Sequence, residues 1–130
     1  MQILVDHNLE GDADLLSAWL IKEGWAELLQ LEFVRFGDVS LDVRSDDTTI
    51  WRFAQARGML ILTKNRNDED ETSLTATIRR ENTLSSLPVI TVASQNCLKE
   101  PLCRQAAALR LAEIVTYLER YLGTGRLYIP

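Results

Sequence analysis

Five short apolar runs recur along this chain, separated by longer and more polar stretches. They span residues 3–6, 31–36, 59–63, 88–93 and 126–129. Three of the runs are almost continuously hydrophobic rather than alternating between apolar and polar positions, which is typical of strands buried on both faces of a sheet. The pattern therefore predicts a sheet whose strands are mostly parallel.

Between these runs lie four segments in which apolar residues recur with the period of a helix. Residues that favour helix starts or ends flank three of them. The first segment covers residues 12–23, the second runs from Ser45-Asp46-Asp47 to Gly58, and the third covers residues 70–82. The fourth ends at Gly123 and carries Ala108, Leu111, Val115, Leu118 and Leu122.

Strands alternating with helices of this length predict right-handed βαβ crossovers and an α/β fold. The expected architecture is a three-layer α/β/α sandwich with a mostly parallel central sheet. No internal repeat or linker divides the sequence, and 130 residues with 46% apolar composition can fill one core. We therefore expect a single domain over residues 1–130.

The cysteines and the N-terminus predict the compartment. No series of basic, apolar and small residues resembling a signal peptide follows Met1, and no apolar run reaches the roughly 20 residues that span a membrane. Cys97 and Cys103 lie six positions apart, without the paired spacing of a zinc site. We expect a cytoplasmic protein with no membrane partner, in which both cysteines are reduced thiols.

The formal net charge of −5 argues against tight binding to duplex DNA, which usually requires a basic surface. It is compatible with a metal-dependent nuclease, because a divalent ion in an acidic pocket contacts phosphate and reverses the local sign of charge. Such a protein should bind nucleic acid weakly without its metal or a partner.

Polar residues collect where ligands bind to open parallel sheets, beyond the carboxyl ends of the strands. Three groups stand there if the strands are adjacent: Asp6-His7-Asn8, Asp46-Asp47, and Thr63-Lys64-Asn65-Arg66-Asn67-Asp68. Oxygen ligands from several loops are what Mg²⁺ or Mn²⁺ requires.

Each of these residues also has a purely structural explanation. Asp46 and Asp47 are favoured at helix starts, and Asn65 and Asn67 suit a turn. The acidic run 68–71 is typical of a solvated helix N-terminus.

The basic residues of the same segments have their own alternatives. Lys64 and Arg66 are placed to meet either phosphate or a neighbouring carboxylate. His7, the single histidine, is either a proton carrier beside Asp6 or an ordinary exposed side chain. No glycine-rich nucleotide motif and no nucleophile elbow is present.

Three segments, in this order, resemble a known family. They read ILVDHNL at 3–9, SDDTTIWRFA at 45–54 and GMLILTKNRND at 58–68. They resemble the small PIN-like domains with an LDENL-type first strand, an SDEEI-type helix start and a strand that ends in TRDRDF. The closing residues 125–130 are similar to the final strand of that group.

The resemblance implies a PIN-like fold and, for many relatives, a Mg²⁺- or Mn²⁺-dependent ribonuclease that is the toxin of a bacterial toxin–antitoxin pair. RNA would then be the substrate and an antitoxin protein the partner. By motif position, Asp6 is the first metal carboxylate and Asp47 the second. The third should come from the aspartates that follow the third strand.

The sequence departs from the family pattern at those last positions. Asn65 and Asn67 stand where TRDRDF has aspartates, and His7 stands where LDENL has an acid. We expect Asn65 and Asn67 to complete the site directly or through water, with Asp68 or Asp70 supplying the missing charge. Lys64 and Arg66 would engage phosphate.

Two other hypotheses stay open. A catalytically inactive PIN-like binding or interaction module is motivated by the two asparagines and the acidic net charge. A receiver-like phosphoacceptor is motivated by Asp6 and Thr63 at strand ends, although no paired acid stands beside Asp6. Small α/β domains often pair, so a homodimer is a further expectation, with no surface assigned to it.

Overall fold

The computed structural model describes residues 1–65 and 70–130, and its centre is a sheet of five parallel strands. The strands are β1 (Gln2–Val5), β2 (Glu32–Val34), β3 (Leu60–Thr63), β4 (Val89–Val92) and β5 (Arg126–Ile129), in the order β2-β1-β3-β4-β5. Every neighbouring pair is parallel. All five predicted strands are confirmed, each within two residues of its expected bounds.

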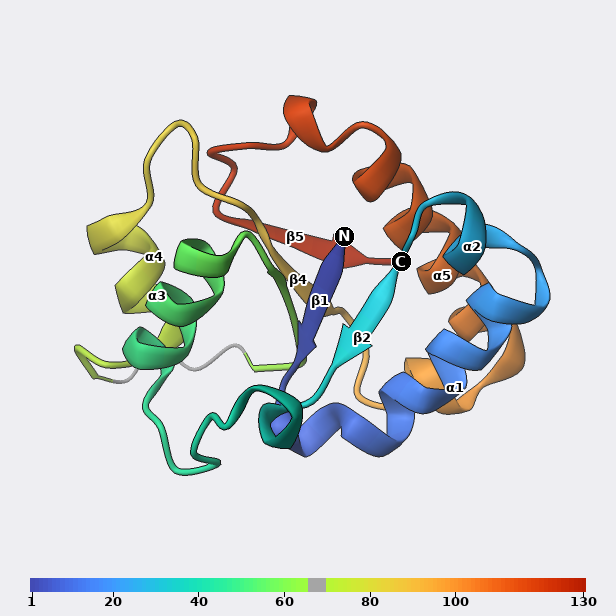
Figure 1. Cartoon of the computed structure of the whole chain (residues 1–130), viewed down its shortest axis with the longest axis horizontal. Coiled ribbons are helices and arrows are strands. Elements are labelled where there is room, and N and C mark those ends of the chain that lie inside the picture. Colours follow the sequence, from blue (N-terminus) through green and yellow to red (C-terminus); the bar gives the residue numbers. More distant parts are fainter. Residues whose placement is uncertain (66–69) are drawn as a thin grey trace.

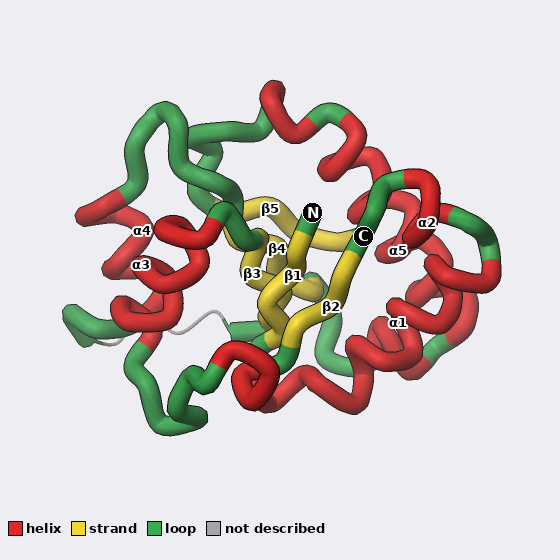
Figure 2. The backbone as a smooth tube through the Cα atoms, viewed as in Figure 1, coloured by secondary structure: helices red, strands yellow, loops and turns green. Residues whose placement is uncertain are grey.

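Helices cover both faces of this sheet, so the predicted three-layer α/β/α sandwich is confirmed. One layer contains α1 (Glu10–Lys22), α2 (Trp25–Leu28) and α5 (Pro101–Thr116), and the other contains α3 (Asp47–Arg57) and α4 (Leu74–Glu81). Figure 1 shows the two layers on either side of the strands, and Figure 2 shows the same division as helices around a central sheet. No helix in the described part of the chain is both long and apolar enough to cross a bilayer.

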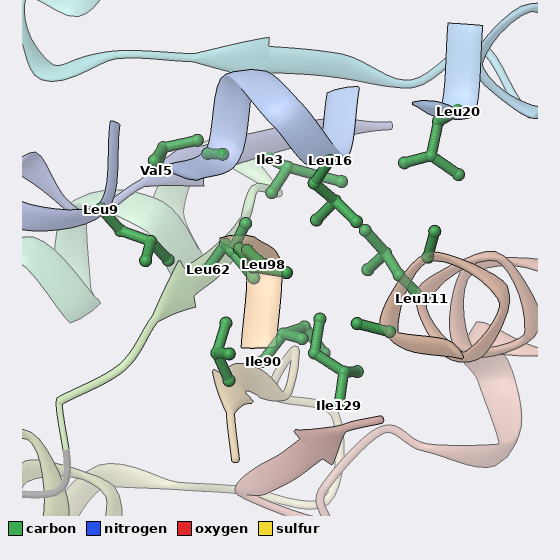
Figure 3. Packing of buried hydrophobic residues seen from close by; sticks show 14 of the residues in the cluster. Ile3, Val5, Leu9, Leu16, Leu20, Leu62, Ile90, Leu98, Leu111 and Ile129 are labelled. Carbon is green, nitrogen blue, oxygen red and sulfur yellow. The ribbon is translucent and has the colours of Figure 1, made fainter. Parts of the chain in front are cut away.

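The strands bury alternate residues in two separate apolar clusters, because successive side chains of a strand point to opposite faces. In β1, Ile3 and Val5 pack toward α1 and α5, whereas Leu4 packs toward α3 and α4. Figure 3 shows the first cluster, where Leu16 of α1 and Leu111 of α5 lie against the strands. Burial on both faces explains why these strands read as continuous apolar runs.

The crossovers do not all have the same hand, so the prediction of right-handed connections throughout is wrong. The chain moves in one direction across the sheet from β3 to β4 and from β4 to β5. The helices of these two connections nevertheless lie on opposite faces. After β4 the chain forms a 3-10 helix, η3 (Cys97–Lys99), which contacts α1 and leads α5 to the same face.

Several helix bounds differ from the predicted ones. The last long helix, α5 (Pro101–Thr116), ends earlier than the predicted end at Gly123. Part of the predicted end of this helix is instead a short 3-10 helix, η4 (Leu118–Arg120). The third predicted helix is reduced to α4, and the four-residue α2 was not predicted.

The two cysteines form a disulfide, which corrects the expectation of reduced thiols. Cys97 in η3 and Cys103 in α5 have Cα atoms 5.0 Å apart and their sulfur atoms are bonded. The close approach arises because the chain reverses between η3 and the start of α5 at Pro101. The argument for a cytoplasmic location from reduced cysteines therefore no longer holds.

Candidate functional site

The candidate site lies at the carboxyl ends of β1 and β3, which are neighbours in the sheet. From β1 the chain leaves to β2 on one side and later returns to β3 on the other, so this is the point where the strand order reverses. Open α/β sheets bind ligands in the crevice at such a point. The first predicted polar group and the described residues of the third, 63–65, therefore meet at one edge of the sheet.

Asp6 follows β1 directly and is held there by two contacts with β3. Its backbone N–H donates to the carbonyl of Leu62 over 2.9 Å, and its Oδ2 accepts a hydrogen bond of 2.7 Å from the hydroxyl of Thr63. Thr63 is 1% exposed, and its Oγ1 also accepts the backbone N–H of Asn65 over 2.9 Å. The buried threonine therefore connects the orientation of Asp6 to the loop that follows β3.

Asp47 is the first residue of α3, and its side chain turns back toward the end of β3. Its Oδ2 accepts hydrogen bonds from Asn65 Nδ2 and from the backbone N–H of Leu74, each over 3.0 Å. One carboxylate oxygen thus joins the start of α3, the loop after β3 and the start of α4. Burial raises the pKa of Asp47, and the negative charges of Asp6 and Asp46 add to this increase in pKa.

Asp46, the adjacent carboxylate, has a structural role instead. It is the N-cap of α3, and its Oδ1 accepts the backbone N–H of Thr49 over 2.8 Å. That hydrogen bond lowers the pKa of Asp46. Of the two neighbours, only Asp47 reaches the site.

Asp6 and Asp47 open into a shared cavity of about 250 Å³. Its lining includes both polar and apolar residues, which come from the segments after β1 and β3, the start of α3 and the segments that precede α3. The lining consists of Asp6, His7, Asn8, Phe36, Val43, Ser45, Asp47, Ile50, Lys64 and Asn65. The predicted residue Lys64 is therefore at the site, whereas Arg66, Asn67 and Asp68 lie outside the described residues.

Arg126 is a site-supporting residue that the sequence analysis missed. From the start of β5, its Nη1 donates to the backbone carbonyl of Asn65 over 2.8 Å and to the hydroxyl of Thr91 over 2.6 Å. Its Nη2 donates to the hydroxyl of Thr75 over 3.1 Å. A charged residue within the last apolar run was the signal that could have identified it.

His7 lines the cavity, and its side chain contacts residues other than Asp6 and Asp47. Its ring lies 6.3 Å from that of Phe36, and its Nδ1 is 3.5 Å from Glu10 Oε1. Glu10 in turn is 3.6 Å from the guanidinium of Arg35. About half of the His7 side chain stays exposed.

The donor set fits a hard divalent cation bound through few protein ligands. Within the described residues, Oδ1 of Asp6 and Oδ1 of Asp47 accept no hydrogen bond, so each carboxylate has an oxygen available. Mg²⁺ is commonly held by one or two carboxylates, with water and phosphate completing its shell. The same residues contain no group of three or more His, Cys, Asp or Glu that could hold a metal, and Asn65 directs its amide nitrogen, not an oxygen, toward Asp47.

Comparisons of this chain with protein-family models, with curated proteins and with solved structures found no match.

Proposed function

We propose that this protein is a divalent-metal-dependent endoribonuclease of PIN-like type. The observation that carries the proposal is the pair Asp6 and Asp47, which share one cavity at the strand-order reversal and each keep an oxygen available. The three motifs that resemble PIN-like domains, in the same order along the chain, support the same proposal. On that resemblance, we also propose that the protein is the toxin of a toxin–antitoxin pair, with the antitoxin as its partner.

In this proposal Asp6 and Asp47 hold Mg²⁺ or Mn²⁺, and the surrounding residues position them. Thr63 orients Asp6 by its hydroxyl, and Asn65 with the backbone N–H of Leu74 orients Asp47. A divalent cation held by these two carboxylates would supply Lewis-acid chemistry toward the scissile phosphate and toward water. Lys64 lines the cavity, where its ammonium group can bind the phosphate.

The raised pKa of Asp47 is consistent with such a site. Burial is the main cause of the raised pKa of Asp47, and the negative charge of Asp6 adds to it. A divalent cation held by both carboxylates would offset these unfavourable effects. Clusters of this kind occur at functional sites more often than at random surface positions.

The test is a calorimetric titration of Mn²⁺ together with an RNA cleavage assay in the same buffer. We expect the wild type to bind Mn²⁺ and to cleave single-stranded RNA, and Asp6→Asn to lose both while keeping its melting temperature. Asp46→Asn is the matched control, because it removes the negative charge adjacent to Asp47 but keeps a side-chain oxygen that can cap α3. Cleavage that survives Asp6→Asn would rule out the assignment.

A second candidate is a catalytically inactive PIN-like interaction module. It is favoured by Asn65, which stands where the family has an acid and donates its amide to Asp47. A neutral donor at that position lowers the affinity of the site for a hard cation. Wild-type protein that binds no Mn²⁺ at millimolar concentration and cleaves no RNA would favour this candidate.

A further inference from the structure

The cavity beside Asp6 and Asp47 has an apolar wall that metal and phosphate binding do not require. Phe36, Val43 and Ile50 form this wall. Phe36 is buried and belongs to the core, but Val43 is 53% exposed although it is a large hydrophobic residue. An exposed apolar side chain beside polar groups in a concave site is typical of ligand recognition.

His7 lines the same cavity, and two residues contact its imidazole ring. Phe36 contacts it at a tilt of 40°, and Glu10 lies 3.5 Å from its Nδ1. Glu10 is itself fixed by Arg35, which also donates to Asp14. The ring is therefore preorganised, with about half of its side chain open to solvent.

We propose that His7, Asn8 and Val43 form a nucleobase-binding subsite, with the ring of His7 as the stacking platform. This inference rests on the proposed function, and it adds to that function a subsite for one unstacked base of single-stranded RNA. Proteins that recognise single-stranded RNA stack unpaired bases on aromatic rings, including histidine, and read their edges with polar side chains. Asn8 lines the cavity and offers both an amide donor and a carbonyl acceptor.

One cavity holds both the residues proposed to bind phosphate and the residues proposed to bind the base. Asp6, Asp47 and Lys64 line it together with His7, Asn8 and Val43. We expect a nucleotide whose phosphate is bound at the carboxylates and Lys64 to place its base against His7. The subsite would then select which residue of the RNA lies next to the scissile bond.

A base is uncharged, so the carboxylates do not repel it as they repel a phosphate. Binding of the base alone can therefore be measured without metal. Adenosine, guanosine, cytidine and uridine are suitable probes, because each carries a base and a ribose but no phosphate.

The experiment is a titration of each nucleoside into ¹⁵N-labelled protein with EDTA, followed by amide chemical shifts. We expect at least one nucleoside to shift the amides of His7, Asn8 and Val43. His7→Ala should weaken that binding by about fivefold or more, and His7→Phe, which keeps an aromatic face, should largely restore it. Tyr117→Ala is the matched control, because Tyr117 is 47% exposed and does not line this cavity.

The readouts separate the failure of this inference from that of the nuclease proposal. No shift at the cavity with any nucleoside, in a wild type that cleaves RNA, would overturn the subsite alone. Equal binding by wild type and His7→Ala would also overturn it. Nucleoside binding in a protein that cleaves no RNA would retain the subsite and contradict the nuclease.

Discussion

Asp46 and Asp47 are neighbours in sequence, yet the fold gives their carboxylates opposite environments. Asp46 caps α3 and accepts a backbone N–H, which lowers its pKa. Asp47 points into the cavity near Asp6, and burial raises its pKa. Both residues match a helix start equally well by residue preference. In the structure, the direction of each side chain separates the residue that caps α3 from the residue that lines the cavity.

Asp47→Asn should stabilise the metal-free protein at neutral pH. Asparagine keeps an oxygen that can accept the N–H of Leu74, and it removes a charge that burial and Asp6 disfavour. Because the folded pKa of Asp47 is raised, wild-type stability is complete below the unfolded pKa and decreases as pH rises through the folded pKa. The gain in the free energy of unfolding should therefore be absent in acid, grow through that window and then remain constant. Urea denaturation with a chelator, from acidic to neutral pH, measures it.

Asp46→Asn is the control of opposite sign. Since its folded pKa is lowered, Asp46 contributes stability that is present above the unfolded pKa and is lost as pH falls through the folded pKa. This variant should be somewhat less stable than the wild type at neutral pH and equal to it in acid. Identical pH profiles for the two variants would contradict the placement of Asp47 in a partly desolvated site.

At the scale of elements, the sheet could be predicted because strands buried on both faces consist of continuous runs of apolar residues. The end of the last long helix was placed too late, and its start at Pro101 was not assigned, although proline is favoured at the first position of a helix. The four-residue α2 is too short to show a helical period. The disulfide could not be predicted, because it depends on how η3 and α5 fold back on each other.

The candidate site was also predictable only in part, because some of its contacts depend on how distant segments of the chain pack together. The rule that ligands bind at strand ends predicted that Asp6, Lys64 and Asn65 lie together, and all three line one cavity. The support that Arg126 gives to the backbone of Asn65 joins positions far apart in the chain. Its detection requires the pairing of β5 beside β4, which local patterns do not specify.

The disulfide between Cys97 in η3 and Cys103 in α5 should contribute measurably to the free energy of unfolding. A disulfide that closes so short a loop stabilises a protein by about 2 kcal/mol in the chain-entropy description. We expect reduction with a phosphine, or Cys103→Ser, to lower the free energy of unfolding by about that amount. Cys97 is 1% exposed, so substitution at Cys103 avoids placing a hydroxyl in the core. The phosphine should have no effect on Cys103→Ser.

Labelling of free thiols tests whether the disulfide is present. Native protein without reductant should contain no thiol that reacts with maleimide after denaturation. Two reactive thiols, together with a melting temperature that reductant does not change, would contradict the disulfide.

At the scale of the whole molecule, the charge balance does not favour holding RNA by its phosphates. The net charge is −5, and several of the described arginines are already engaged with carboxylates. These include Arg35 with Asp14, Arg52 with Glu81, and Arg110 with Glu113. Electrostatic attraction of RNA therefore depends on the site itself and on the cation that it is proposed to hold.

RNA binding should accordingly be weak without metal and should depend little on salt. The affinity for single strands falls with salt in proportion to the number of phosphates neutralised. With contacts confined to the cavity, we expect the logarithm of affinity to fall against the logarithm of salt with a slope of about −1 to −2. Fluorescence anisotropy of a short labelled RNA in EDTA and in Ca²⁺, over a tenfold range of salt, measures both quantities. Tight binding in EDTA with a slope steeper than about −4 would indicate an extended basic surface and contradict a site that relies on its cation.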